Sequence, residues 1–516
     1  MNCQAGERNP ESAHISWITP VAWTIIGFGC ALRLIRLVAD RNLWLDELMV
    51  ASDVLGRPLA DLAQPLNGTG APLGFLVVTR LAIDALGDHD WVFRLLPFLA
   101  GCSALVLLYR VSLRLLTLRG VLFVLAILAV VEPALYYSVE FKQYSVDLAV
   151  TLAILLVALR ARHSERSAGR LFALGLVGTV CVWFSFPTVF VLAGVGTTLL
   201  AVELIEGRYR MAVGLLAVVG TWLSSFVAVY LVSPHDLIGN EELRDAWSGT
   251  FMPLSPGAMV KWQAEALYDS LGRRTLGIPQ VGAAVLAAAL GVADLARRYP
   301  EGLGFILLPL AFSMAASAFD QYPFGGRQIL FLAPCLALLV AAGMDVLLRE
   351  SQPMVRLAGI LLVLVIMTQT VWKGVRQTLG GHAKEEIGTV LRHVATQWQP
   401  GDTLYLYYGA VRGYARYAAR AGIPTSVTPI VGVRNRWNDW RAYRVYSEDI
   451  ARFAGSERVW VIFSHIRRPP HMDHESIVVT AFEQMGQRLE EVHATGASAY
   501  LYDLRDAKGG EESGSN

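Results

Sequence analysis

Residues 17–47 read WITPVAWTIIGFGCALRLIRLVADRNLWLDE, an apolar run from Trp17 to Val38 that ends shortly before two adjacent carboxylates, Asp46 and Glu47. The run is long enough to cross a bilayer, which takes about 20 apolar residues. Ionised side chains close to hydrocarbon are costly and are kept where a charge has a function. The stretch therefore predicts a membrane anchor followed by a reaction centre at the two carboxylates.

The composition extends this interpretation to most of the chain. Of 516 residues, 54% are hydrophobic and only 17% are charged, and the mean hydropathy is +0.44. A soluble protein needs a smaller apolar share, so the sequence predicts an α-helical polytopic membrane protein that contacts membrane lipids. The formal net charge of +1 leaves no excess of cations for a nucleic-acid partner.

Apolar runs of spanning length predict about eleven transmembrane helices. They lie near 17–38, 92–114, 120–139, 145–160, 170–184, 187–205, 211–232, 279–296, 302–319, 329–348 and 357–375. A shorter and more polar segment, 72–87, is expected to be a juxtamembrane helix on the outer surface, because a span there would reverse the sidedness of the loops that follow.

Arginines gather in alternate loops, which gives the orientation. One set of loops holds Arg110, Arg114, Arg119, Arg160, Arg162, Arg166, Arg170, Arg208, Arg210, Arg297, Arg298, Arg349 and Arg356. The positive-inside rule assigns these loops to the cytoplasm, with the amino terminus, in a bacterial-type inner membrane. Asp46 and everything after Lys373 are then periplasmic. The outer end of the first run carries Arg33, Arg36 and Arg41, which disagrees with this assignment. The later loops contain more arginines, so the assignment follows them.

After Lys373 the pattern changes to short apolar strands alternating with helical segments. Strands are predicted at 403–408, 458–464 and 499–503, and helices at 414–421 and around 477–490. The expected domains are a transmembrane domain at 1–376 with an outer catalytic loop at 40–91, a soluble periplasmic α/β domain at 377–505 and a disordered tail at 506–516.

Polar residues concentrate at the predicted outer face. Beside the Asp46-Glu47 pair, they are found in Glu140-Phe-Lys142-Gln-Tyr144 and in Tyr322-Pro-Phe-Gly-Gly-Arg327. Carboxylates facing cations form a pocket suited to a phosphorylated substrate. The alternative is that these side chains are loop caps and interface anchors, since Lys, Arg and Tyr favour the headgroup level in any membrane protein.

The order of these features resembles a known family. A span, Trp44-x-Asp46-Glu47, a Gly/Pro loop, a surface helix and Trp91-Val-Phe-Arg94-Leu-Leu-Pro97 follow one another. This layout, over about residues 17–350, resembles polytopic glycosyltransferases of the C-type fold, in particular the protein O-mannosyltransferases and aminoarabinose transferases of family 39. One departure is Ala71-Pro72, where the aminoarabinose transferases carry Lys-Pro.

The resemblance implies a glycosyltransferase that moves a hexose or pentose from a polyprenyl-phosphate donor to a glycan, lipid or protein acceptor at the outer face. It implies that Asp46 is the general base that an attacking hydroxyl needs. Glu47 would orient the acceptor or bind a cation. The charges of Lys142 and Arg327 suit the donor phosphate, and the list of candidate phosphate-binding residues is Lys142, Arg327, Tyr144 and Arg94, with Arg33 as a weaker candidate.

Three alternatives stay open from the sequence. A divalent cation at Asp46 and Glu47 is compatible with their carboxylate oxygens, and no other cofactor is indicated. A transporter or flippase of a lipid-linked saccharide would need paired ionisable groups near the middle of the membrane, whereas these charges collect at one rim. The cluster of His465, His471, Asp473 and His474 matches no defined zinc spacing, so a Pro-rich solvated loop is favoured there.

Overall fold

The computed structural model describes residues 10–66, 69–162, 168–232, 247–381, 383–435, 440–469 and 471–505. The tail predicted at 506–516 lies outside these ranges. The chain divides into two compact units. The helical unit comprises Met1–Ala39 and Val54–Gly381, and the sheet unit comprises Asp40–Asp53 and His382–Asn516.

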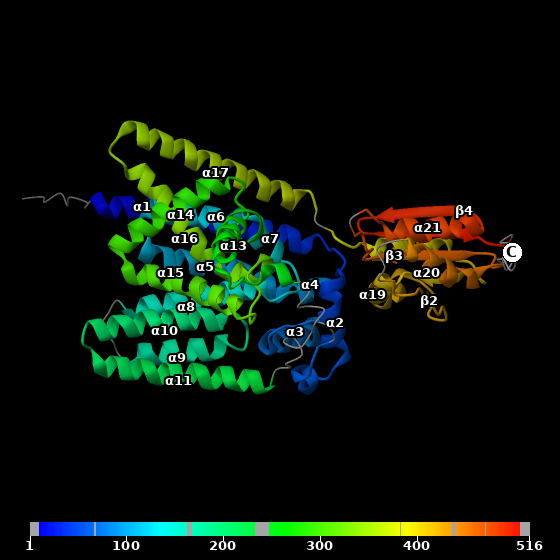
Figure 1. The fold of residues 1–516 in the computed structure, drawn as a ribbon, viewed down its shortest axis with the longest axis horizontal. Helices are drawn as coiled ribbons and strands as arrows, with labels where there is room; N and C mark the ends of the chain where they lie inside the picture. Colours follow the sequence, from blue (N-terminus) through cyan, green and yellow to red (C-terminus); the bar gives the residue numbers. More distant parts are fainter. Residues whose placement is uncertain are drawn as a thin grey trace, which may run out of the picture. The chain divides into compact units, whose positions relative to one another are not determined.

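The helical unit is a bundle of long helices (Figure 1). Its elements are α1 (Pro10–Val38), η1 (Leu59–Ala63), α3 (Leu73–Leu86), α4 (Asp90–Phe93), α5 (Leu95–Leu115), α6 (Leu118–Val130), α7 (Glu132–Tyr137), α8 (Tyr144–Arg162), α9 (Ala168–Cys181), α10 (Thr188–Ile205), α11 (Tyr209–Val232), η3 (Ser248–Thr250), α13 (Pro256–Asp269), η4 (Ser270–Arg274), α14 (Val281–Arg298), α15 (Pro300–Ala318), η5 (Gly326–Leu332), α16 (Ala333–Arg349) and α17 (Pro353–Leu379).

Each of the eleven predicted spans coincides with described helices. By length and composition, 8 of the described helices are able to cross a membrane, and two shorter apolar helices, α6 and α9, accompany them. The predicted class, a helical polytopic membrane protein with a carboxyl-terminal sheet domain, is confirmed. The exact number of spans stays a prediction.

The helix α16 forms the centre of the bundle. Every residue from Ala333 to Asp345 is buried, so α16 is surrounded by protein. It packs closely on α14, because Gly343 of α16 faces the Ala287 carbonyl and Gly291 of α14 faces the Leu339 carbonyl. A side chain at either glycine would meet the backbone of the partner helix. Small residues of this kind let membrane helices approach without a strong hydrophobic driving force.

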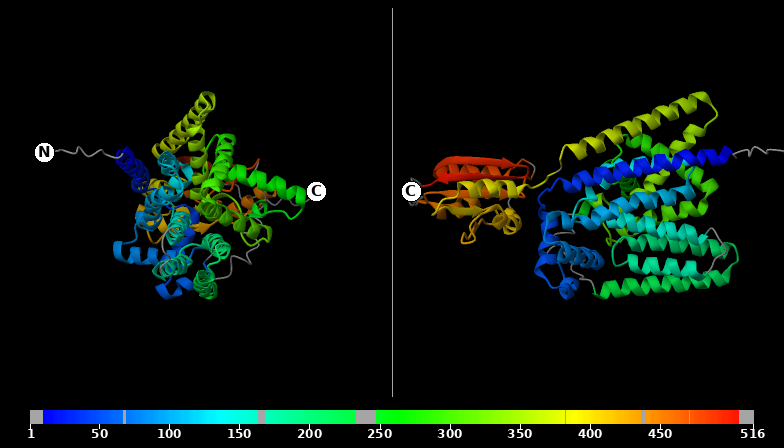
Figure 2. Two further views of the ribbon diagram at one scale, coloured as in Figure 1. Left: turned by 90° about the vertical axis from the view of Figure 1, so that its left-hand side faces the viewer. Right: turned by 180° about the vertical axis from the view of Figure 1, so that it is seen from behind.

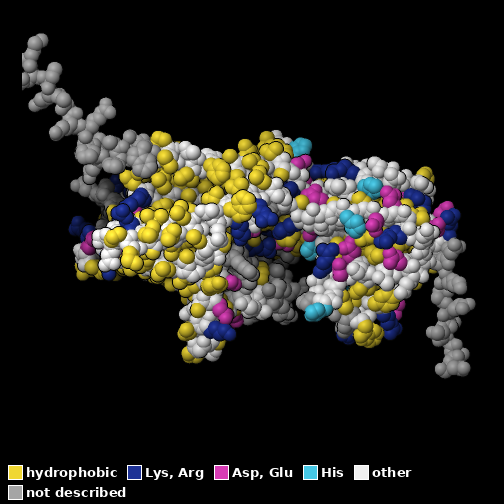
Figure 3. Space-filling view, turned by 90° about the horizontal axis from the view of Figure 1, so that it is seen from above, with side chains coloured by type: hydrophobic (Ala, Val, Ile, Leu, Met, Phe, Trp, Pro, Cys, Tyr) yellow, Lys and Arg dark blue, Asp and Glu magenta, His cyan; other side chains and the backbone are white. Residues whose placement is uncertain are grey.

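Other helices face outward. Only 22% of the apolar window is buried in α11 and in α17, and hydrophobic side chains cover much of the visible surface of the helical unit (Figure 3). The two further views show these long helices running along the outside of the bundle (Figure 2). An apolar outer face of this extent is what a lipid environment requires.

The sheet unit is a small α/β domain. It contains α2 (Leu45–Gly56, of which the last residues belong to the helical unit), α18 (Ile387–Gln397), β1 (Thr403–Leu406), η6 (Tyr408–Ala410), α19 (Val411–Ala421), β2 (Ile430–Val431), α20 (Arg441–Ile450), η7 (Ala451–Phe453), β3 (Val459–Ser464), α21 (His474–Met485), β4 (Gln487–Ala494) and β5 (Ala497–Asp503). The strand order is β2-β1-β3-β5-β4, with β1, β2 and β3 parallel and β5 antiparallel to its neighbours.

Helices lie on both faces of this sheet. On one face Tyr405, Val461 and Tyr500 form a core with α20 and α21. The helix α18 packs against β3, β4 and β5 and against α19. Because helices cover both faces of the sheet, β3 is buried along its whole length and is apolar from Val459 to Phe463.

The predicted helix around 477–490 is wrong at its end. The helix α21 ends at Met485, and residues from Gln487 form β4 in a hairpin with β5. At Gly486 a side chain would contact the Asp503 carbonyl, and Gly496 adopts a left-handed conformation (φ 68°) in the hairpin turn. Charged residues in β4 resemble a helical surface pattern, but here they protect the exposed edge of the sheet.

The packing of α14 on α16 gives a direct test. Replacement Gly343→Ala places a methyl group on the Ala287 carbonyl, and overpacking of this kind costs about 1–3 kcal/mol. We expect a lower melting temperature in detergent. The control is Gly282→Ala in the partner helix α14, where no atom lies within 4 Å of the new carbon. Equal melting temperatures for both variants would contradict the packing described.

Candidate functional site

The acidic pair lies in the first turn of α2. Carboxylates are favoured there because the amino terminus of a helix carries partial positive charge. The Glu47 side chain is buried (1% exposed), and its Oε2 accepts the backbone N–H of Trp44 at 3.3 Å. This is half of a capping box. Glu47 therefore has a structural contact in addition to any role in binding, whereas Asp46 is half-buried.

The residues that lead into α2 are held by the carboxyl-terminal part of the sheet unit. Three backbone N–H groups donate to its side chains: Asn42 to Glu386 Oε1 (3.2 Å), Leu43 to Tyr417 OH (2.6 Å) and Leu45 to Glu385 Oε2 (3.0 Å). The Lys384 ammonium lies 3.3 Å from the centre of the Trp44 ring, a cation–π contact. The segment that carries Asp46 is thus fixed by residues more than 330 positions away.

In the helical unit, three of the predicted phosphate-binding residues meet at one end of the bundle. Lys142 is buried, and its Nζ donates to Thr69 Oγ1 at 3.0 Å. The Arg327 guanidinium lies 5.6 Å from the centre of the Tyr144 ring. Lys142 and Tyr144 are near neighbours in the sequence, whereas Arg327 comes from a distant loop, and the fold brings it to the Tyr144 ring.

Arg94 is placed at the same end of the bundle by the packing of the preceding residue, Phe93. The Phe93 ring packs edge-on against Phe141, 5.1 Å between centres, and Phe141 precedes Lys142. Arg94 itself is 2% exposed. The buried position agrees with a cation that is held inside the bundle.

Arg33 and Arg36 have structural contacts. Arg33 donates to the carbonyl groups of Leu128 and Ala129, both at 3.1 Å, at the end of α6. Arg36 lies 5.6 Å from the Tyr136 ring centre. Both arginines are buried, so they are not the loop charges that the positive-inside rule counts. Their burial removes most of the disagreement noted for the first span.

The sequence analysis overlooked Asp147. This residue lies in the first turn of α8 and is 3% exposed. Its carboxylate is close enough to Ser185 and to Tyr322 to interact with both. Burial, and then the charge of Asp147, raises the pKa of Tyr322 well above its ordinary value. Tyr322 stays a neutral donor and bonds the Gln328 carbonyl at 2.7 Å. The sequence does contain a signal for this residue, because Asp147 is a single carboxylate within an apolar run.

A pocket of about 150 Å³ adjoins the Tyr322–Arg327 motif. The motif contributes Phe324, Gly325 and Gly326, and α13 contributes Trp262, Glu265 and Asp269. The rings of Trp262 and Phe324 are 5.7 Å apart. An aromatic wall with a few polar groups is a common form of small-molecule site. Of the segment between the spans predicted at 211–232 and 279–296, residues 233–246 lie outside the described ranges.

Metal ligands do not gather in the described part of the chain. No group of three or more His, Cys, Asp or Glu side chains is placed there to hold an ion. His465 Nδ1 lies 2.8 Å from Glu385, His474 Nδ1 lies 2.9 Å from Tyr446 OH, and Asp473 caps α21. These contacts account for three members of the histidine cluster without a metal.

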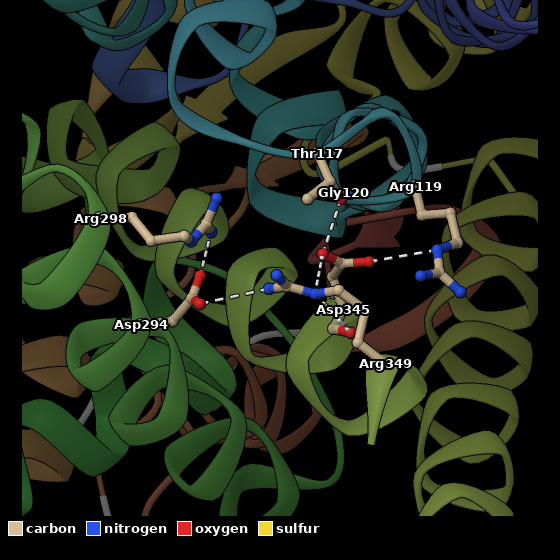
Figure 4. A network of polar contacts seen from close by, with 7 residues as sticks. All are labelled: Thr117, Arg119, Gly120, Asp294, Arg298, Asp345 and Arg349. Carbon is tan, nitrogen blue, oxygen red and sulfur yellow. Dashed lines mark hydrogen bonds and ion pairs between the residues drawn. The ribbon is translucent and has the colours of Figure 1, made fainter. Parts of the chain in front are cut away.

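The opposite end of the bundle contains a network centred on Asp345 (Figure 4). Asp345 accepts from Thr117 Oγ1 at 2.6 Å and pairs with Arg119 at 3.3 Å and with Arg349 at 3.0 Å. Arg349 and Arg298 also pair with Asp294. Three of the arginine-rich loops that were predicted to share one side therefore meet at this end, here called the arginine end.

Comparisons with known proteins found similarity only among solved structures. No protein-family model and no curated protein matches the chain. It is similar to ArnT from Cupriavidus metallidurans bound to undecaprenyl phosphate, at 13% identity and a TM-score of 0.48, over 95% of this chain and 98% of that one. It is also similar to the oligosaccharyltransferase AglB from Archaeoglobus fulgidus in complex with an inhibitory peptide and a dolichol-phosphate, at 12% identity and 0.48, over 94% and 74%. At these values the similarity gives no ground for assigning an activity.

Removal of one hydroxyl group tests how the segment that carries Asp46 is held. Replacement Tyr417→Phe removes the acceptor of the Leu43 N–H, and a lost hydrogen bond of this kind costs about 1–3 kcal/mol. We expect hydrogen exchange at residues 42–46 to accelerate by roughly tenfold or more, measured by mass spectrometry. Tyr414→Phe on the same helix is the control. Unchanged exchange in the Tyr417 variant would show that the segment is held elsewhere.

Proposed function

We propose that this protein is a membrane glycosyltransferase that moves a sugar from a polyprenyl-phosphate donor to an acceptor at the outer face of the cytoplasmic membrane. One observation carries the proposal. Two cations from distant loops, Lys142 and Arg327, lie at one end of the bundle, and the loop of Arg327 also lines a pocket with an aromatic wall. A phosphate and a sugar ring are the two groups that such a site suits.

The leaving group explains why cations are needed. When the bond between the anomeric carbon and the phosphate oxygen breaks, both bonding electrons stay with the polyprenyl phosphate, which gains a negative charge. Lys142 supplies a compact positive charge and Arg327 a planar fork of donors. Stabilising charge that develops at the leaving oxygen is the largest contribution that such a site can make.

The attacking hydroxyl must lose a proton. In the proposed step the acceptor oxygen forms a bond to the anomeric carbon while Asp46 takes the hydroxyl proton. The reaction is a single displacement, so the anomeric configuration inverts. Glu47, whose carboxylate already caps α2, holds the turn that presents Asp46. A divalent cation bound by both carboxylates is compatible with this step but is not required by it.

The pocket beside Arg327 is assigned to a sugar. Trp262 offers an apolar face on which a pyranose ring can stack, and Glu265 and Asp269 can accept hydrogen bonds from hydroxyl groups. Asp147 lies at the first turn of α8, near the same end. It does not provide the paired ionisable groups in mid-membrane that a transporter path needs.

We infer the orientation of the protein in the membrane from the distribution of arginines. The arginine end, with Arg119, Arg298 and Arg349, faces the cytoplasm by the positive-inside rule. The end with Lys142 and Arg327, the Asp46 segment and the sheet unit then face the periplasm. The amino terminus is cytoplasmic.

The role of Asp46 is tested by Asp46→Asn. Loss of a general base lowers turnover by about 10²- to 10⁴-fold, while membrane insertion and melting temperature stay unchanged. The assay supplies purified protein with a panel of radiolabelled polyprenyl-phosphate sugars and measures release of the free carrier phosphate. The control is Asp84→Asn, an exposed carboxylate of α3 that pairs only with Arg80 among the described residues. Normal turnover by the Asp46 variant would remove it from the mechanism.

The roles of the cations are tested by Lys142→Met and Arg327→Gln. A hydrogen bond to a charged group contributes about 1.5–3 kcal/mol, so kcat/KM for the donor should fall by roughly 10- to 150-fold in each variant. Arg327→Lys should recover part of the loss, because it restores the charge but not the fork. Arg297→Gln, at the arginine end, is the control. A kcat/KM close to the wild-type value in both variants would contradict the assignment.

A further inference from the structure

A pocket in the helical unit lies at the arginine end, away from Lys142 and Arg327. Its volume is about 430 Å³, within the range of small-molecule sites. Arg114 of α5, Arg160 of α8 and Arg170 of α9 line it, with small or apolar residues between them. Three helices thus each contribute one guanidinium group to a single cavity.

The partners of these arginines differ from those of their neighbours. At the same end of the bundle, Arg119 and Arg349 pair with Asp345, and Arg208 pairs with Glu203 at 2.7 Å. Within the described ranges, no ion pair joins Arg114, Arg160 or Arg170 to an acidic side chain, and no acidic residue lines the pocket. The one hydrogen bond recorded among them runs from Arg170 to the Arg160 carbonyl at 3.3 Å.

Three like charges around one cavity repel one another, and the repulsion grows as water is excluded. The cost is offset when an anion enters. Guanidinium groups bind phosphate oxygens through two parallel N–H bonds, which makes phosphate the best-matched anion. Basic pockets between membrane helices on the cytoplasmic side are known to hold anionic lipid headgroups.

We propose that Arg114, Arg160 and Arg170 form a binding site for a phosphate group that carries two or more negative charges, supplied by the headgroup of an anionic lipid at the arginine end. A single phosphodiester would leave two of the three positive charges uncompensated. A phosphomonoester or a paired-phosphate headgroup balances them better. This site is separate from the donor site at the opposite end, and it ties α5 to α8 and α9 through a shared ligand.

The test uses the full-length protein, delipidated in neutral detergent. Melting temperature and native mass spectra are measured with added cardiolipin, phosphatidic acid or phosphatidylcholine, and with inorganic pyrophosphate without lipid. Wild-type protein, Arg160→Gln, the triple variant Arg114→Gln/Arg160→Gln/Arg170→Gln and Arg297→Gln are compared. Arg297 is an exposed arginine at the same end that does not line the pocket.

Cardiolipin and phosphatidic acid should bind and stabilise the wild-type protein more than phosphatidylcholine does. Each arginine removed should weaken this binding roughly fivefold, and Arg297→Gln should leave it unchanged. If pyrophosphate alone binds to the same arginines, the site binds phosphate, and the phosphate group comes from a soluble molecule rather than from a lipid headgroup.

Equal binding by the single variant and the wild-type protein, or an equal loss in Arg297→Gln, would overturn the site. Arg160→Gln decides the matter if the triple variant fails to fold, because it removes one exposed side chain only.

Discussion

The backbone hydrogen bonds that Asn42, Leu43 and Leu45 donate to the carboxyl-terminal domain are the constraint on which the proposed active site depends. The segment between α1 and α2 is short. Side-chain atoms of Glu386, Tyr417 and Glu385 accept hydrogen bonds from its backbone, and the Lys384 contact with Trp44 adds to them. The carboxyl-terminal part of the sheet unit therefore supports the segment that carries the acidic pair.

Charged side chains gather at both ends of the bundle. At the arginine end, Asp345 and Asp294 neutralise Arg119, Arg298 and Arg349 (Figure 4). A buried ion pair at a helix end satisfies groups that would otherwise be costly near hydrocarbon. At the other end, the described contacts of Lys142 and Arg327 are with a hydroxyl and an aromatic ring. These contacts hold the two cations at the end of the bundle where the donor phosphate is proposed to bind.

The sequence was sufficient for the parts of the structure that periodicity and hydropathy control. The helical segments and the carboxyl-terminal strands at 403–406 and 459–464 follow from such local patterns. It was insufficient where long-range contacts decide. The helix predicted around 477–490 runs past the end of α21 into the edge strand β4, and the buried Asp147 lies inside an apolar run. The grouping of residues 40–53 with the carboxyl-terminal domain depends on hydrogen bonds between distant positions, which no local pattern reveals.

The central claim is that the Asp46 segment and the Arg327 loop face one aqueous compartment, the periplasm, and that the arginine end faces the cytoplasm. Single cysteines at Asp320, Arg420 and Arg297, in a chain without its native cysteines, can be labelled in sealed cells with a membrane-impermeant maleimide. The account predicts that Asp320→Cys and Arg420→Cys react in intact cells, whereas Arg297→Cys reacts only after permeabilisation. Labelling of Asp320→Cys and Arg420→Cys from opposite sides, or of Arg297→Cys from outside, would contradict it.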